Sequence, residues 1–221
     1  MDGEQLEYEY AAPKDIHVIS RSDIRLTGGE IRTLSNIDFT AAQIYPTTGA
    51  QATILAGVYS YRFAGDTAHY STMMKGSTVS FHRLEGSSDA PPPLSLYGQL
   101  TVGADIINQG GALRAPLGRI SLGMGGSQFY PGPEMAEPGQ IGWGSGNHIT
   151  TSEVNLLPGS LTSVSAKGLT IPYGGTTDGL SWMLNGQKID TTLASQGVTV
   201  VGSLRADQGS VLDLSVGGMP T

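Results

Sequence analysis

Short segments in which apolar and polar residues alternate recur along this chain of 221 residues. Leu100-Thr101-Val102 and Ile120-Ser121-Leu122 each place two aliphatic side chains on one face of a strand and a hydroxyl on the other. The two triplets stand 20 positions apart, with the turn cluster Asn108-Gln109-Gly110-Gly111 and the lone Leu113 between them. This spacing suits one turn of a parallel β-helix, in which each coil stacks on the previous one, and an antiparallel pair of hairpins is the alternative.

The first half of the chain shows the same pattern. Aliphatic residues recur in short groups across residues 17–44, and Gly28-Gly29 and Ser35-Asn36 divide these groups. Residues 52–56, 58–63 and 77–81 are rich in β-branched and aromatic types. We therefore expect consecutive short strands and an all-β fold.

Three segments interrupt the pattern. Residues 86–93 end in three successive prolines, which cannot donate to a sheet, and residues 123–146 are too rich in glycine and proline for a strand ladder. Residues 172–188 contain the turn Asn185-Gly186 and predict a projecting hairpin. We expect loop excursions at these three places, an irregular or disordered segment at 1–15, and a β-helical shaft over 16–221.

The last third of the chain contains an apparent internal repeat. Gly159-Ser160-Leu161 resembles Gly202-Ser203-Leu204 at an offset of 43 positions. The final strand-like segment, Val211-Leu212-Asp213-Leu214, is followed by no polar or helical cap, which predicts a piece of a longer solenoid.

Alternation also predicts which aliphatic residues share one continuous core. These residues are Leu100, Val102, Ile106, Leu113, Ile120, Leu122, Leu161, Leu169, Ile171, Leu204, Leu212 and Leu214.

Composition narrows the possible functions. Only 14% of residues are charged, the net charge is −7, and no basic cluster occurs, so nucleic acid is not an expected partner. The absence of cysteine excludes disulfides, thiolate metal sites and catalytic thiols. No apolar run is long enough to span a membrane, and the acidic N-terminal stretch lacks the features of a secretory signal.

Candidate chemistry is sparse. The four histidines stand far apart and in no ligand spacing. Polysaccharide-processing β-helix enzymes gather carboxylates on adjacent coils, and the residues weighed for that role are Asp105, Asp190, Asp207 and Asp213. No motif places one of them beside another, and Asp213 falls on the solvent face of its strand. The sequence predicts no catalytic residues, no metal site, no cofactor and no enzyme activity.

Aromatic residues in two of the glycine-rich loops form a possible contact surface. They are Phe129, Tyr130, Trp143, Tyr173 and Trp182. Aromatic side chains beside glycines are common both in contact sites and in loops that fold back over a core.

Four stretches carry a resemblance to a known family. Residues 106–123 (IINQGGALRAPLGRISLG), 157–165 (LPGSLTSVS), 171–176 (IPYGGT) and 209–215 (GSVLDLS) resemble the shaft of filamentous-haemagglutinin-type large exoproteins of Gram-negative bacteria. The likeness covers about residues 94–218 well and residues 16–93 only in style.

The resemblance implies a long right-handed β-helix of the two-partner secretion family, exported through an outer-membrane transporter partner. Such exoproteins act at the cell surface as adhesins, which contact a host or neighbouring-cell receptor or glycan, or as stalks of contact-dependent toxins. The Asn-Pro-Asn-Gly-type motif of the family's export domain is missing, so we expect an interior shaft segment. A polysaccharide-processing β-helix enzyme and a phage-type tail fibre segment are the alternatives.

Overall fold

The structure is a computed structural model that describes residues 6–9, 14–63, 70–87, 90–125, 127–129, 146–170, 182–184, 187–189 and 196–215. The described residues form 23 strands and no helix, so the prediction of an all-β protein is confirmed. No helix in this part of the chain is therefore long and apolar enough to cross a membrane.

Most strands belong to three sheets with parallel pairing throughout. The first sheet contains β2 (Ile16–Ile19), β5 (Ile37–Ala41), β10 (Thr78–Arg83), β12 (Ile106–Gly110), β17 (Glu153–Leu156) and β22 (Ser203–Ala206), in that order. The second contains β3 (Ile24–Leu26), β6 (Ile44–Pro46), β13 (Ala112–Arg114), β18 (Leu161–Ser163) and β23 (Val211–Asp213). The third contains β4 (Gly29–Thr33), β7 (Gln51–Ala56), β11 (Gln99–Gly103), β14 (Arg119–Leu122) and β21 (Gly197–Val200).

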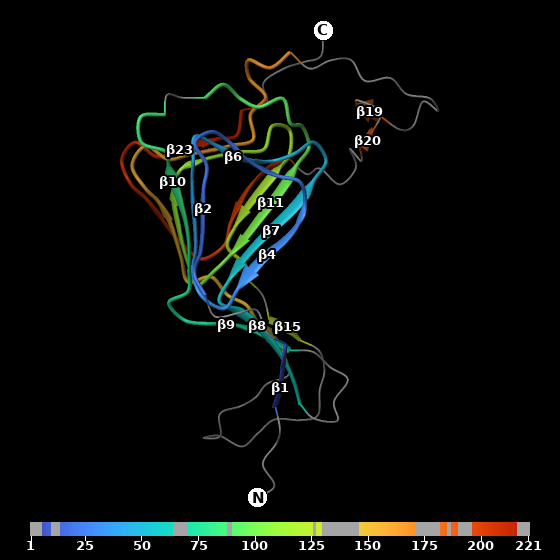
Figure 1. The fold of residues 1–221 in the computed structure, drawn as a ribbon, viewed down its shortest axis with the longest axis vertical. Coiled ribbons are helices and arrows are strands. Elements are labelled where there is room, and N and C mark those ends of the chain that lie inside the picture. The colour runs from blue at the N-terminus through green and yellow to red at the C-terminus, as the bar shows by residue number, and fades with distance from the viewer. Residues whose placement is uncertain are drawn as a thin grey trace, which may run out of the picture.

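The chain visits the three sheets in rotation, and we call one passage through them a round. Rounds 1, 2 and 4 are β2-β3-β4, β5-β6-β7 and β12-β13-β14. Round 3 contains β10 and β11 without a strand in the second sheet, round 5 contains β17, β18 and β21, and round 6 contains β22 and β23. Figure 1 shows β2 and β10 on one side of the body, β4, β7 and β11 on another, and β6 and β23 across the top.

The 20-residue spacing in the sequence corresponds to one such round. Leu100 pairs with Ile120, and Val102 pairs with Leu122, in the parallel ladder between β11 and β14. The prediction that these two triplets stack on each other is therefore confirmed, and the antiparallel alternative is wrong for them.

The remaining strands form two further sheets, which are separate from the three parallel sheets. A fourth sheet contains β1 (Leu6–Glu9), β8 (Val58–Phe63), β9 (Tyr70–Met73), β16 (Gly146–His148) and β15 (Ser127–Phe129), in that order. It lies below the body in Figure 1. Residues 6–9, which fall within the segment expected to be irregular, pair antiparallel with β8. The strands β19 (Trp182–Leu184) and β20 (Gln187–Ile189) pair antiparallel across Asn185-Gly186, which confirms the predicted hairpin.

The core lies between the three parallel sheets. One continuous cluster of buried side chains extends from Leu26 in round 1 to Val164 after β18. Phe39 and Phe81, which are register partners on β5 and β10, stack with their ring centroids 5.5 Å apart. Stacking of like side chains on successive strands therefore joins the rounds into one apolar interior.

The predicted core is confirmed for Leu100, Val102, Leu113, Ile120 and Leu122, all of which are fully buried.

The register is wrong at two positions. Ile106 is only half-buried, and its neighbour Ile107 faces the core instead. Leu161 is likewise half-buried, and Thr162 takes the core position beside Leu113.

The last three predicted core residues are exposed. Leu204, Leu212 and Leu214 have exposed fractions of 49%, 40% and 55%. Leu204 and Leu212 continue core positions of the preceding strands, since they pair with Val154 and Thr162. They are exposed because β22 and β23 are the outermost strands of their sheets among the described residues.

The two remaining predicted core residues, Leu169 and Ile171, follow β18 in the sequence. Leu169 packs with Leu96 in a small separate cluster, whereas Ile171 lies outside the described residues.

The predicted 43-residue repeat is also wrong. Glu153 pairs with Ser203, and Leu161 pairs with Val211, so rounds 5 and 6 are offset by 50 positions. Gly159-Ser160-Leu161 and Gly202-Ser203-Leu204 therefore occupy different sheets, and they look alike because each precedes or starts a strand after a turn.

A candidate binding cleft and its surroundings

Two neighbouring strands of the second sheet present only polar or aromatic side chains outward. Ile24 and Ile44 pair and face the core, so alternation directs their register neighbours Arg25 and Tyr45 to the outside. The flanking positions continue the pattern, with Asp23 and Thr27 beside β3 and Gln43 and Thr47 beside β6. Six such residues therefore form a polar surface across β3 and β6.

The chain segment that replaces the missing strand of round 3 forms a wall beside this surface. Residues 91–95 run along the outside of β6, where the Ser95 hydroxyl donates to the Pro46 carbonyl at 2.8 Å. Farther along, the Leu96 amide donates to the Thr48 hydroxyl at 3.3 Å. The wall and the polar surface enclose a cleft of about 890 Å³, a size within the range of small-molecule sites.

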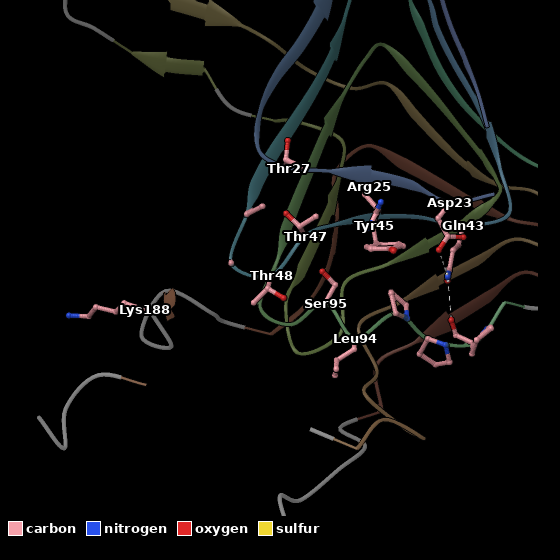
Figure 2. A pocket seen from close by; sticks show the side chains of 15 residues that line it. Asp23, Arg25, Thr27, Gln43, Tyr45, Thr47, Thr48, Leu94, Ser95 and Lys188 are labelled. Carbon is pink, nitrogen blue, oxygen red and sulfur yellow. Dashed lines mark hydrogen bonds between the residues drawn. The ribbon is translucent and has the colours of Figure 1, made fainter. Parts of the chain in front are cut away.

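Hydrogen bonds fix the floor of the cleft, as Figure 2 shows. Gln43 Nε2 donates to the Asp23 carboxylate at 3.0 Å and to the Pro91 carbonyl at 3.3 Å. Both partners are acceptors, so the orientation of the Gln43 amide is determined. Gln43 thereby ties the floor to the wall.

The cleft contains an acidic residue, Asp23, a tyrosine, Tyr45, and a basic residue, Arg25. Burial of the Tyr45 ring and the charge of Asp23, which accepts a hydrogen bond from the Tyr45 hydroxyl, raise the pKa of Tyr45. Tyr45 therefore stays a neutral donor at neutral pH. Arg25 is exposed, and its positive charge acts in the opposite direction on the pKa of Tyr45, but its side chain makes no hydrogen bond or ion pair within the described part of the chain.

Lys188 of β20 adds a second cation at the rim, where its side chain is exposed. The carboxylate of Asp23 accepts hydrogen bonds from Gln43 and Tyr45. It forms no ion pair with Arg25 or Lys188 among the described residues.

The sequence prediction missed this cleft. The floor of the cleft can be recognised in the sequence, because one alternating pattern occurs twice, 20 positions apart, in residues 23–27 (DIRLT) and 43–47 (QIYPT). Its wall has no such signal, since nothing in residues 91–95 indicates which strands they cover.

Two histidines that the sequence separates lie together on the outer face of the first sheet. His17 Nδ1 is 3.1 Å and His82 Nε2 is 3.8 Å from carboxylate oxygens of Asp38. No group of histidine, aspartate or glutamate side chains among the described residues is arranged to hold a metal ion. The three side chains therefore lie close together on the surface of this sheet.

The carboxylates weighed for catalysis are not brought together. Asp207 pairs with Arg205 at 3.1 Å, and Asp213 accepts hydrogen bonds from Ser163 and Ser215. Asp207 follows β22 and Asp213 ends β23, so the two carboxylates belong to different sheets, and Asp190 lies outside the described residues.

Asp105 is buried, unlike Asp207 and Asp213, the other two carboxylates of this group that the structure describes. It accepts hydrogen bonds from the Gly76 amide at 2.7 Å, from the Ser152 hydroxyl at 2.5 Å and from Lys75 Nζ at 3.1 Å. Its partners come from the chain before β10 and before β17. Asp105 thus joins the corners of three successive rounds.

The free energy of unfolding at acidic pH should depend on the carboxylate of Asp105. Burial alone would raise the pKa of Asp105, but the hydrogen bonds from Gly76, Ser152 and Lys75 outweigh it and lower the pKa below the ordinary value. A lowered folded-state pKa stabilises the protein above the unfolded pKa of about 3.9 and loses that contribution as the pH falls through the folded value. We expect Asp105→Asn to reduce stability at neutral pH and to flatten the loss of stability below about pH 4.

Urea unfolding from about pH 6 to about pH 3 measures this effect. Asp207→Asn is the matched control, because Asp207 is paired only at the surface of the last round. An unchanged acid slope in Asp105→Asn would contradict the assignment.

The predicted aromatic contact surface stays a prediction. Tyr130, Trp143 and Tyr173 lie outside the described residues, and for Phe129 and Trp182 only the backbone is described, in β15 and β19.

Comparison with known proteins returned no match for this chain among protein-family models, curated proteins or solved structures.

Proposed function

We propose that this chain is a shaft segment of a secreted bacterial surface exoprotein and that it folds as a right-handed parallel β-helix. The observation that carries the proposal is the rotation of the chain through three parallel sheets around one continuous apolar core. A chain that repeats this geometry gains length without changing its cross-section. Length at constant cross-section is what a stalk or shaft requires.

The sequence resemblance extends the proposal to location and partners. A filamentous-haemagglutinin-type shaft is exported through an outer-membrane transporter and presented at the bacterial cell surface. In this setting the segment serves as the structural and adhesive part of an adhesin or a toxin stalk, and its partners are receptors or glycans on host or neighbouring cells.

Adhesion is expected to depend on surfaces outside the shaft core. Trp143 belongs to the excursion between rounds 4 and 5, and Trp182 to the excursion within round 5. Replacing both by alanine should therefore weaken attachment to cells without lowering the melting temperature. Attachment of the purified chain to cultured cells, compared between the wild type and the double variant, measures this. Equal attachment by the two proteins would remove these aromatic residues from the contact surface.

Catalysis is not part of the proposal. Asp105, Asp207 and Asp213 each have their own partners, and no two of them face each other. The purified chain should release no reducing or unsaturated ends from pectin or glycosaminoglycan, and release that Asp207→Asn or Asp213→Asn abolishes would overturn this view.

A further inference from the structure

The cleft over β3 and β6 has the chemistry of a ligand site rather than of a packing defect. Its outward side chains are polar or aromatic on both strands, although the same strands present aliphatic residues inward. An ordinary solvent-exposed sheet face is open to water. Here residues 91–95 are held beside the polar surface by the hydrogen bonds of Ser95 to Pro46 and of Gln43 to Pro91. The floor and the wall are therefore held in fixed positions before any ligand arrives.

The two kinds of surface in the cleft suit the two kinds of surface on a sugar. Carboxylate and hydroxyl groups of Asp23, Thr27 and Thr47 offer hydrogen bonds to sugar hydroxyls. The wall offers apolar surface, because Pro91 is exposed and Leu94 has an exposed fraction of 51%. Apolar contact with the C–H face of a ring, together with hydrogen bonds at its edge, is a common way to hold a hydroxyl-rich ligand.

The positively charged side chains that line the cleft favour acidic over neutral saccharides. Arg25, at the centre of β3, lines the cleft and has no hydrogen-bond or ion-pair partner within the described residues, whereas Lys188 lies apart from the other lining residues and its side chain extends away from them (Figure 2). Asp23, which lies two positions before Arg25, accepts hydrogen bonds from Gln43 and Tyr45 and makes no ion pair with Arg25, so its carboxylate oxygens keep lone pairs for sugar hydroxyls. A guanidinium group without a partner beside hydroxyl groups favours a ligand that carries a carboxylate among hydroxyls.

We propose that this cleft binds an acidic oligosaccharide, with a sugar carboxylate on Arg25, hydroxyls on Asp23 and the threonines, and a ring face against Pro91 and Leu94. The inference rests on the proposed adhesive function, to which it adds a ligand class and a place on the shaft.

Isothermal titration calorimetry with two probes tests the proposal. The acidic probe is tri-galacturonate, and the neutral probe is maltotriose, which has the same number of rings. We expect the wild-type protein to bind tri-galacturonate more tightly than maltotriose. Arg25→Gln should weaken tri-galacturonate binding by about tenfold or more, because it removes a charge-assisted hydrogen bond.

Arg21→Gln is the matched control, since Arg21 is exposed on the same round but does not line the cleft. It should leave the affinity for tri-galacturonate unchanged. Amide chemical shifts that change at Thr27 and Thr47 on titration would locate the ligand, and a melting temperature shared by all three proteins would show that they are folded.

Three outcomes would overturn the proposal: no binding of tri-galacturonate at millimolar concentration, equal affinity for the two probes, or equal affinity in Arg25→Gln and the wild type. The cell-attachment comparison with the tryptophan variants is independent of these titrations. Failure of the adhesive function would leave the calorimetric result intact, so the two failures are distinguishable.

Discussion

Replacing Leu122 by aspartate should unfold the protein or come close to doing so. Leu122 is fully buried on β14 between its register partners Val102 and Val200. An aspartate at this place would bury a charge without a partner, at a cost of several kcal/mol, which is comparable with the total stability of many domains. Urea unfolding followed by circular dichroism measures the loss.

The neighbouring residue provides the control. Ser121 lies on the outer face of the same strand, between Thr101 and Thr199, so Ser121→Asp places the same charge in water one position away. We expect it to change the stability by less than about 1 kcal/mol. Similar losses for the two variants would mean that the assigned faces of β14 are wrong.

Replacing Gln109 by alanine should have the second largest effect. Gln109 is fully buried in a core position between Phe81 and Leu156. Its Nε2 donates to the Leu161 carbonyl at 3.0 Å and to the Thr162 hydroxyl at 3.1 Å, and its Oε1 accepts from the Gly111 amide at 3.1 Å. Truncation would leave these buried groups without partners and create a cavity, at a cost of about 3 kcal/mol or more.

Asn108 is the matched control for Gln109. It lies on the outer face of β12, where it contacts Asn155 at 3.1 Å, and its side chain is only half-buried. Asn108→Ala should cost about 1 kcal/mol or less in the same denaturation experiment. A loss for Gln109→Ala no greater than that for Asn108→Ala would refute the structural role of the buried amide.

The strands could be predicted from the sequence where alternation is clean. Leu100-Thr101-Val102 and Ile120-Ser121-Leu122 each have one apolar face, so their register followed directly. Ile106-Ile107 has two aliphatic residues in succession, and alternation cannot choose between them. Leu161 was assigned to the core because it is aliphatic, but the hydrogen bond from Gln109 stabilises Thr162 there instead.

The cleft could be predicted only in part for a related reason. Strand periodicity indicates that Arg25 and Tyr45 face outward, but it carries no information about which distant segment covers them. Residues 91–95 reach this place because round 3 omits its strand in the second sheet, so that Ile44 of β6 pairs directly with Leu113 of β13. Such an omission depends on long-range pairing, which a local pattern does not record.

That omission also has a mechanical consequence. In a stack of repeats each unit usually contacts only its neighbours, so units detach one after another from an end. Here rounds 2 and 4 are joined past round 3 at two places, through β6 and β13 and through β9 and β16, which extend from these rounds. Under a force applied along the stack, rounds 2 to 4 should therefore unfold together as one unit, while round 6, which has no such links among the described residues, can detach before them.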